Sequence, residues 1–538
     1  MSTKGLFKVT HDQVAEAFKK AKGNISTVSR VLGVSRSTVR RHIAPLGLGK
    51  KPIASGSRHG LKTVRMVLPA EGQIKRYILT AAQNNTYVHE CVWRNIQALA
   101  KHYDAKILVG TFSYNQNHFG PLAVKRGKKN PYEYELWYDE HIATFINDER
   151  VQLGKGLVWC GEQNIVPTAP DPLAGLETYS GRQSAIFPHS KIALRTIASI
   201  QGSGAKLNYT TGTVTKRNYI QKRAGLIAEF HHTYGGLLVE VDSDGVWKVR
   251  QLDAEDDTGT IYDLTLKVEN GVVTDGHSVE AIIWGDIHAT IIDPTVFALS
   301  ATAKNNMLDV LKPKYQFVHD LMEGVSVNHH GLRKPMDRFK AWMRGLNNVQ
   351  TELVKSSNVL RNYSRPSTSM VIVNSNHDRW LDRFLDEFDP RMDDPSNLEI
   401  YHDGNAARLR FARNNEDLNV LEYLIRQHGG WDIPAKFLGW DESFLICNKK
   451  LECGQHGDLG ANGSKGASVS MAKIGRRSII GHTHVTGIWD GLYVVGTSTK
   501  FRMGYNHGPS SWTHSHAVVY PNGKRTIITM FQGAWRAE

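Results

Sequence analysis

The chain has 538 residues, of which 41% are hydrophobic, and a formal net charge of +14. Its length predicts more than one domain. No apolar run approaches the roughly 20 residues of a membrane-spanning helix, and the N-terminus lacks the apolar stretch of a secretory signal. The four cysteines show no CxxC spacing, which argues against a disulfide framework or a zinc ribbon. We therefore expect a cytoplasmic protein with no membrane partner.

Basic charge is concentrated near the N-terminus. Residues 1–63 contain thirteen lysines and arginines against two acidic residues, so that +11 of the +14 lies in this segment. A polyanion is the natural partner of such a segment. Nucleic acid fits better than a membrane, because no apolar face accompanies the charge. The sequence therefore predicts DNA as a partner.

Residues 1–46 predict three short helices. Thr10 and Gln13 have the spacing of a capping box, and apolar residues follow at helical spacing. A second helix is predicted over 25–32, and a third over 36–43, capped by Ser35. The pattern resembles the helix-turn-helix of Fis-like and resolvase-like DNA-binding domains, with a small oligomerisation bundle as the alternative. The side chains expected to face DNA are Arg36, Ser37, Thr38, Arg40 and Arg41.

Residues 47–63 are rich in glycine, serine and basic residues, and predict a flexible linker. Residues 64–277 predict a middle region of α/β and β-rich character, with a helix over 87–103, a strand over 106–111 and further strands from 236 onward. No function is predicted for this region. Its basic stretch 216–223 is interpreted as solvated surface, with nucleic-acid contact as the alternative.

Five polar clusters follow short apolar runs that are typical of β-strands. Imidazole, carboxylate and carboxamide groups without thiolates suit two divalent ions bridged by a carboxylate. The absence of thiolates favours Mn²⁺, Mg²⁺ or iron over structural zinc. The sequence thus predicts a two-metal hydrolase. The clusters are Trp284-Gly-Asp286-Ile-His288, His319-Asp320, Asn376-His377-Asp378, His456-Gly-Asp458 and Gly481-His482-Thr-His484.

In their order, these clusters resemble the calcineurin-like metallophosphoesterase family, which includes SbcD-type repair nucleases and phage-encoded phosphoesterases. The resemblance implies an α/β fold over residues 278–538, in which a sandwich of two mixed sheets is flanked by helices and holds metal ions at strand ends. The middle region and the N-terminal helix-turn-helix would precede it. The chain departs from the family in carrying His319 and Ser375 where the family has glycine.

Carried over to this chain, the resemblance implies two ion sites and a catalytic histidine. Asp286, His288 and His484 would hold one ion, and Asn376, His456 and His482 the other. Asp320 would bridge the two ions, with Asp309 or Asp337 as possible substitutes. His377 would stabilise or protonate the leaving oxygen, and Asp378 would orient His377. The alternative is a fold that keeps these histidines as polar residues without metal.

The expected function is that of a metal-dependent phosphodiesterase acting on DNA, a nuclease using a hydroxide activated by two ions. Mn²⁺ is the expected metal, with Mg²⁺ or iron as alternatives. A phosphatase of phosphoproteins or small phosphoesters stays open, as does a non-enzymatic DNA-binding regulator. A homo-oligomer also stays open, and a phage-encoded chain would work in the host cytoplasm. Finally, the sequence predicts one long helix over 337–360 and a C-terminal hairpin over 517–529.

Overall fold

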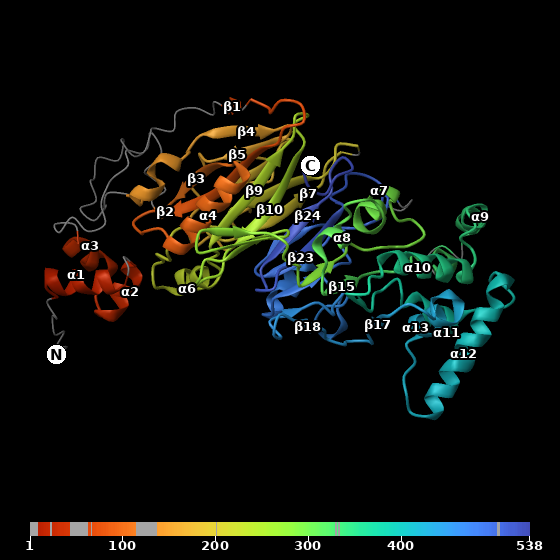
Figure 1. Cartoon of the computed structure of the whole chain (residues 1–538). Helices are drawn as coiled ribbons and strands as arrows, with labels where there is room; N and C mark the ends of the chain where they lie inside the picture. Colours follow the sequence, from red (N-terminus) through yellow and green to blue (C-terminus); the bar gives the residue numbers. More distant parts are fainter. Residues whose placement is uncertain are drawn as a thin grey trace. The chain divides into compact units, whose positions relative to one another are not determined.

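The computed structural model shows a mixed α/β protein with several sheets and helices (Figure 1). Most of the predicted linker 47–63 lies outside the described residues, as do His329, His330 and Arg333. Among the described helices, none is both long and apolar enough to cross a membrane. The structure describes residues 9–21, 24–43, 63–65, 67–114, 137–200, 202–328, 331, 334–502 and 506–537.

Two compact units make up the chain. Unit 1 comprises Met1–Arg195, Leu207–Asp275 and Ala537–Glu538. Unit 2 comprises Thr196–Lys206 and Gly276–Arg536. Each unit contains its own helices and strands, and the five metal-ligand clusters predicted from the sequence all belong to unit 2.

Unit 1 begins with the three predicted helices, α1 (His11–Lys20), α2 (Ile25–Val31) and α3 (Arg36–Ile43). The Thr10 hydroxyl accepts a hydrogen bond from the Gln13 amide, and the Gln13 side chain accepts one from the Thr10 amide, so the predicted capping box is confirmed. Their use as a helix-turn-helix stays a prediction. Their shared core consists of Val14, Phe18, Ile25, Val28, Val39 and Ile43.

The side chains of α3 differ in exposure. Arg41 is exposed, whereas Thr38 and Arg40 are half-buried, and the side chain of Ser37 lies outside the described part. The expectation that Arg36 is exposed was wrong, because its guanidinium donates a hydrogen bond to Asn218 Oδ1 at 3.0 Å. Burial, reinforced by the charge of Arg40, lowers the pKa of Arg36 to about 10. Arg41 is therefore the α3 arginine that is exposed for a nucleic acid.

A four-stranded sheet with the order β10-β9-β2-β3 lies beyond these helices in unit 1. Strands β2 and β3 are parallel, and α4 connects them and packs its apolar side on the sheet through Val92, Ile96 and Leu99. The α/β unit predicted for this part of the chain is therefore confirmed. The elements are β2 (Lys75–Gln83), α4 (Glu90–Tyr103), β3 (Lys106–Phe112), β9 (Gly235–Val241) and β10 (Trp247–Asp253).

Two further groups of strands belong to unit 1, except that the boundary with unit 2 falls inside two of the strands, after Arg195 and before Leu207. Strands β1, β4, β5, β6 and β8 are hydrogen-bonded in that order, and β11, β12 and β13 form a three-stranded antiparallel sheet. The stretch 216–223 is the expected solvated surface only in its second half, because residues 220–223 are exposed whereas Asn218 and Tyr219 are buried. The bounds are β1 (Thr63–Arg65), η2 (Glu140–Phe145), β4 (Arg150–Gly154), β5 (Leu157–Cys160), β6 (Ser184–Phe187), β7 (Leu194–Ile197), β8 (Lys206–Thr210), α6 (Arg223–Phe230), β11 (Ile261–Asp263), β12 (Leu266–Glu269) and β13 (Val272–Thr274).

Unit 2 contains a six-stranded mixed sheet with the order β17-β16-β15-β14-β23-β24. Its first four strands are parallel, and β23 and β24 form the predicted C-terminal hairpin, which is antiparallel. A second run of strands in this unit has the order β21-β22-β20-β19-β18. The strands are β14 (Ala281–Ile283), β15 (Tyr315–Val318), β16 (Ser369–Ile372), β17 (Ala435–Phe437), β18 (Leu445–Ile446), β19 (Leu451–Glu452), β20 (Ser478–Ile480), β21 (Gly487–Trp489), β22 (Leu492–Val494), β23 (Ser515–Val519) and β24 (Arg525–Thr529).

The long helix predicted over 337–360 is two helices, α9 and α10. Gly345, between them, has a φ of +61°, a left-handed conformation that ends α9. Asn348 then caps α10 by accepting a hydrogen bond from the Thr351 amide at 2.9 Å. The helices of unit 2 are α7 (Pro294–Phe297), η3 (Ala298–Thr302), α8 (Met307–Leu311), η4 (Val325–Val327), α9 (Pro335–Met343), α10 (Val349–Tyr363), α11 (Trp380–Glu387), η5 (Pro395–Asn397), α12 (Leu398–Arg413), α13 (Val420–Ile425), η6 (Arg426–Gly430), η7 (Ala461–Gly463), α14 (Ser468–Met471) and η8 (Ala472–Ile474).

Buried charge holds together the sheet of unit 1. The carboxylate of Glu240 on β9 lies 2.6 Å from Arg250 on β10 and 2.9 Å from Arg76 on β2. Arg250 also bonds both oxygens of Asp263, at 2.7 and 2.9 Å. Burial raises the pKa of Glu240, but Arg250 and Arg76 override it and bring the pKa to about 2. The carboxylate is therefore ionised and paired across three strands.

Replacing Glu240 with Gln should destabilise unit 1 by about 3–5 kcal/mol, because Arg250 is left as an incompletely compensated buried charge. Thermal and urea unfolding at neutral pH would measure the loss. The folded-state pKa is depressed, so the stabilisation exists above the ordinary value of 4.5 and is lost toward about 2. The difference in the free energy of unfolding between the parent protein and the Glu240→Gln variant should therefore narrow as pH falls below 4.5. The matched control is Glu269→Gln, which breaks a half-exposed pair with Lys267 and should change stability little.

Candidate metal centre

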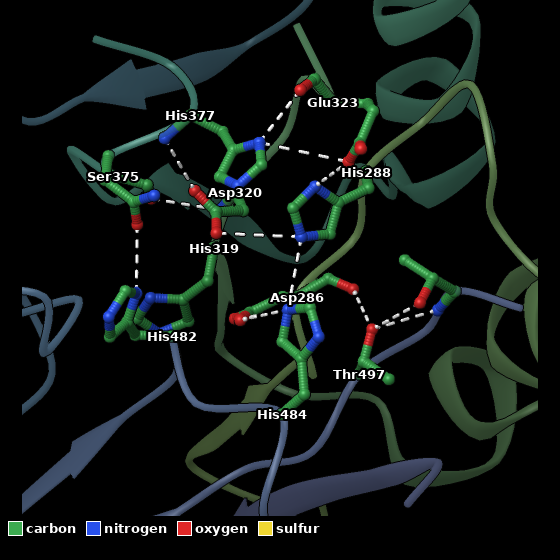
Figure 2. A network of polar contacts seen from close by, with 12 residues as sticks. Asp286, His288, His319, Asp320, Glu323, Ser375, His377, His482, His484 and Thr497 are labelled. Carbon is green, nitrogen blue, oxygen red and sulfur yellow. Dashed lines mark hydrogen bonds and ion pairs between the residues drawn. The ribbon is translucent and has the colours of Figure 1, made fainter. Parts of the chain in front are cut away.

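The carboxyl ends of parallel strands hold the predicted clusters of unit 2. Strands β14, β15 and β16 pair in parallel, and Asp286, Asp320 and Asn376 follow them in that order. His456 and His482 follow β19 and β20, which are also parallel neighbours. Carboxyl ends of parallel strands meet at one edge of a sheet, so side chains on the following loops can converge. Figure 2 shows the convergence of Asp286, Asp320 and His482.

One group of the converging side chains consists of Asp286, His288, Asp320 and His484. One ligand atom from each lies within 4.8 Å of all the others. His484 Nε2 is 3.0 Å from Asp286 Oδ2 and 3.2 Å from His288 Nε2. All four residues are buried, the most exposed being His484 at 5%. These are the residues expected to hold one ion, together with the expected bridge.

The other expected ion site is assembled around Asn376. Its Oδ1 lies 3.0 Å from both His456 Nε2 and His482 Nδ1. Asp320 connects this group with the first, because its Oδ2 is 3.2 Å from His456 Nε2 and 3.6 Å from His288 Nε2. A single carboxylate oxygen thus faces histidines of both groups, which is the position that a bridging ligand requires.

The donor set fits divalent cations. Within the described part of the chain, the buried Oδ1 of Asp286 has no hydrogen-bond partner, although it lies among imidazoles. A buried carboxylate oxygen without a donor is costly unless a cation or a proton compensates it. Carboxylate oxygens, one carboxamide oxygen and imidazole nitrogens are ligands suited to manganese, magnesium or iron.

Charge within the centre is balanced by protons on the imidazoles. Burial lowers the pKa of His288, but the charges of Glu323 and Asp320 override it and raise the pKa to about 9. Burial likewise opposes protonation of His456, and Asp320 again raises its pKa to about 9. Burial raises the pKa of Asp320, yet the surrounding histidines bring it well below its usual range. A bound cation would take over the compensation that these protons provide.

Four residues of the centre adopt left-handed backbone conformations: His288 (φ 44°), Asp320 (φ 42°), His482 (φ 72°) and His484 (φ 57°). Aspartate and histidine adopt this region more often than most residues, although a positive φ is uncommon for any residue but glycine. Conformations of this kind occur at functional sites, and here all four residues follow the ends of strands.

The last cluster begins with a glycine, Gly481, because the backbone there passes close to Asp286. A Cβ atom built on it would lie 2.2 Å from Asp286 Oδ1 and 3.2 Å from His319 Cγ. Backbone and ligand therefore approach more closely than any side chain would allow. Glycine at this position lets the turn after β20 pack directly against the carboxylate that follows β14.

Glu323 and His319 also belong to the centre, although the sequence analysis gave them no role there. Glu323 Oε2 lies 2.7 Å from His288 Nδ1, which leaves His288 Nε2 facing Asp320. His319 Nδ1 lies 3.2 Å from His456 Nδ1, which leaves His456 Nε2 facing Asp320 and Asn376. Partners of this kind fix the ring orientation of metal-binding histidines. Both lie within three residues of Asp320, and His319 is also part of one of the five polar clusters.

His377 and Asp378 differ from the roles expected for them. His377 Nδ1 donates a hydrogen bond to the backbone oxygen of Glu323 at 2.8 Å, and its ring stacks on Trp380. The expectation that Asp378 orients His377 was wrong, because its carboxylate accepts hydrogen bonds from the backbone amides of Leu321 and Met322. Burial raises the pKa of Asp378 to about 7. Asp378 fixes the loop that carries Asp320, and the Glu323 carbonyl orients His377.

The two possible substitutes for Asp320 lie outside the centre. Asp309 on α8 pairs with Arg365 at 2.7 Å, and Asp337 on α9 pairs with Lys340 at 4.0 Å. Neither carboxylate belongs to a group of potential metal ligands among the described residues. Asp320 is therefore the aspartate placed to bridge the two ion sites.

Replacing Asp320 with Asn should lower the affinity for at least one ion by about tenfold or more, since it removes the shared negative charge. Elemental analysis after gel filtration would measure bound metal, and circular dichroism would verify the fold. The matched control is Asp309→Asn, which removes an equal charge outside the centre and should leave the metal content unchanged. Full occupancy of both sites in the Asp320 variant would contradict the assignment.

The chain is similar to a phage protein over most of its length. No protein-family model matches the chain, and no solved structure matches it. Protein A1 of Escherichia phage T5 is 37% identical over 477 residues, which cover 86% of this chain and 83% of the relative. The similarity thus extends well beyond the candidate centre. The chain belongs to the same protein family as Protein A1 of Escherichia phage T5.

Proposed function

We propose that the chain is a metal-dependent phosphodiesterase that hydrolyses DNA. In this proposal, unit 2 is a calcineurin-like metallophosphoesterase domain with its two-sheet sandwich, and α1–α3 form a helix-turn-helix. The observation that carries the proposal is that the seven expected ligands, from five separate loops, form two adjoining groups, and that Asp320 Oδ2 faces a histidine of each group. A fold that used these residues only for packing would have no need of a carboxylate oxygen shared between two histidine groups.

The chain's own residues have distinct tasks in this reaction. Two divalent ions, when bound, supply Lewis acidity toward the phosphate and activate the attacking water. Asp286, Asp320 and Asn376 fix the ligand positions through the strand ends. His377 Nδ1 faces a carbonyl oxygen, which only accepts hydrogen bonds, so the proton of the neutral ring is held at Nδ1. Nε2 is then unprotonated in the neutral ring, so it protonates the leaving oxygen only from the imidazolium form, which burial disfavours by lowering the pKa of His377.

DNA is the substrate that best fits the charge of the chain. Residues 1–63 carry +11 of the net charge of +14. Neutralising phosphates with lysine and arginine is the main source of sequence-independent DNA affinity. Joined to a phosphoester-hydrolysing centre on the same chain, such a segment would hold a polynucleotide near the metals. A small phosphoester needs no basic segment of this size.

The direct test is hydrolysis by the purified full-length protein in Mn²⁺ or Mg²⁺. Linear, circular and single-stranded DNA would be offered beside a chromogenic phosphodiester and a chromogenic monoester. Cleavage of DNA and of the diester supports the proposal. Hydrolysis of the monoester alone would indicate a phosphatase, and DNA binding without any hydrolysis would indicate a DNA-binding regulator.

Replacing His377 with Ala should leave both ions bound and lower turnover of the diester by about 10²–10⁴-fold, the usual contribution of one acid–base group. Steady-state kinetics at saturating metal would measure this loss, together with metal content by elemental analysis. The control is His402→Ala, which removes an exposed histidine from α12 and should keep the normal rate. A normal rate in the His377 variant would show that the ring only packs against Trp380.

Replacing Arg41 with Ala should weaken binding of duplex DNA without changing hydrolysis of the small diester. Each lost phosphate contact should reduce the slope of log affinity against log salt by about 0.9. Fluorescence anisotropy across a salt series would measure the slope. The matched control is Lys101→Ala, which removes one exposed positive charge from α4. An equal loss in both variants would show that only total charge matters and that α3 has no special role.

A further inference from the structure

Unit 2 has a hollow beside the candidate metal centre. Its lining includes His456, one of the expected ligands, and reaches Trp440 through Asn374, Arg379 and Asp458. A molecule that occupied the metal centre would therefore have this hollow next to it. Its lining combines polar side chains and glycines with two apolar side chains, those of Trp440 and Leu459.

Trp440 is exposed, yet its ring is held in place. The residue is 60% accessible, and the Arg379 guanidinium carbon lies 4.6 Å from its ring centroid. Arg379 in turn donates a hydrogen bond to Asn374 Oδ1 at 2.8 Å and forms an ion pair with Asp458. The guanidinium thus contacts the ring while its own charge is matched by a carboxylate.

The same loops position the ring and the metal ligands. Asn374 lies two residues before Asn376, and Asp458 lies two residues after His456. Arg379 bonds both loops and also stacks on Trp440, so the indole is fixed relative to the centre. A tryptophan that served only the core would be mostly buried, since the burial of an aromatic ring is strongly favourable.

We propose that Trp440 is a stacking shelf for a nucleobase of the DNA strand whose phosphate occupies the metal centre. This inference rests on the proposed function and deepens it. A base can lie on an indole face only when it is unpaired and unstacked, because both faces of a base inside a duplex are covered. The enzyme therefore prefers single-stranded DNA or frayed ends over intact duplex.

The shelf accepts any base, because stacking depends on the π-face and every base has one. The Arg379 charge is matched by Asp458, so Arg379 acts as a positioning residue for the indole. We therefore expect the enzyme to prefer single-stranded over double-stranded DNA without preferring any particular base at this position.

The test uses a deoxydinucleotide, which offers a single internucleotide phosphate to the basic segment, and the same dinucleotide with an abasic sugar in place of one base. Two readouts are taken in the full-length protein: kcat/KM in Mn²⁺, and binding by calorimetry in EDTA. Replacing Trp440 with Ala should lower both kcat/KM and the binding affinity for the base-bearing dinucleotide by about 5- to 150-fold, the range of base–aromatic stacking. The abasic dinucleotide should give the same kcat/KM and the same affinity with the parent protein and with the Trp440→Ala variant.

Two further variants sharpen the test. Trp440→Phe keeps a ring and should recover most of the response, whereas Trp431→Ala removes another exposed indole, at 78% accessibility, and should have no effect. Equal responses of the parent protein and the Trp440→Ala variant to the base-bearing dinucleotide would overturn the shelf. So would a parent protein that cleaves intact duplex faster than single strands.

The two proposals can fail separately. A parent protein that cleaves no DNA in any metal would refute the proposed function, and the calorimetric comparison would still decide whether Trp440 binds a base. A parent protein that cleaves DNA while the Trp440→Ala variant does so equally well would leave the nuclease in place and remove the shelf.

Discussion

Two buried carboxylates among imidazoles are the constraint on which the centre of unit 2 depends. Asp286 and Asp320 are 0% and 1% exposed, and a buried carboxylate costs several kcal/mol unless positive charge lies beside it. The histidines supply that charge as protons, and a divalent ion would supply more of it. The turns that follow five strands place the histidines beside these carboxylates, and hydrogen bonds within the surrounding loops keep them there.

Strand topology makes this arrangement possible. Parallel pairing of β14, β15 and β16 places three loop ends at one sheet edge, and parallel pairing of β19 and β20 does the same for two more. The loops are then fixed by bonds that involve no ligand atom. Asp378 holds the loop after β15, and the absence of a side chain on Gly481 lets the turn after β20 approach Asp286. Ligand positions are thus determined mainly by backbone contacts.

The sequence was informative where local pattern and function coincide. Short apolar runs followed by polar clusters predicted both the strands and the positions of the ligands, because such residues have no packing reason to follow a buried strand. It was uninformative where partners are distant. Nothing local indicated that Arg36 would bond Asn218, 182 residues away, or that the backbone oxygen of Glu323 would orient His377. The break at Gly345 was missed because the apolar spacing continues across it, whereas the left-handed backbone does not.

The left-handed residues of the centre have a consequence for how the protein tolerates change. Glycine or asparagine at positions 288, 320, 482 or 484 would relieve backbone strain. At positions 288, 320 and 484 the same change would leave a buried charge of the centre without a partner, which costs more than the strain. The buried charges therefore keep these residues in their left-handed conformations whether or not a metal is bound.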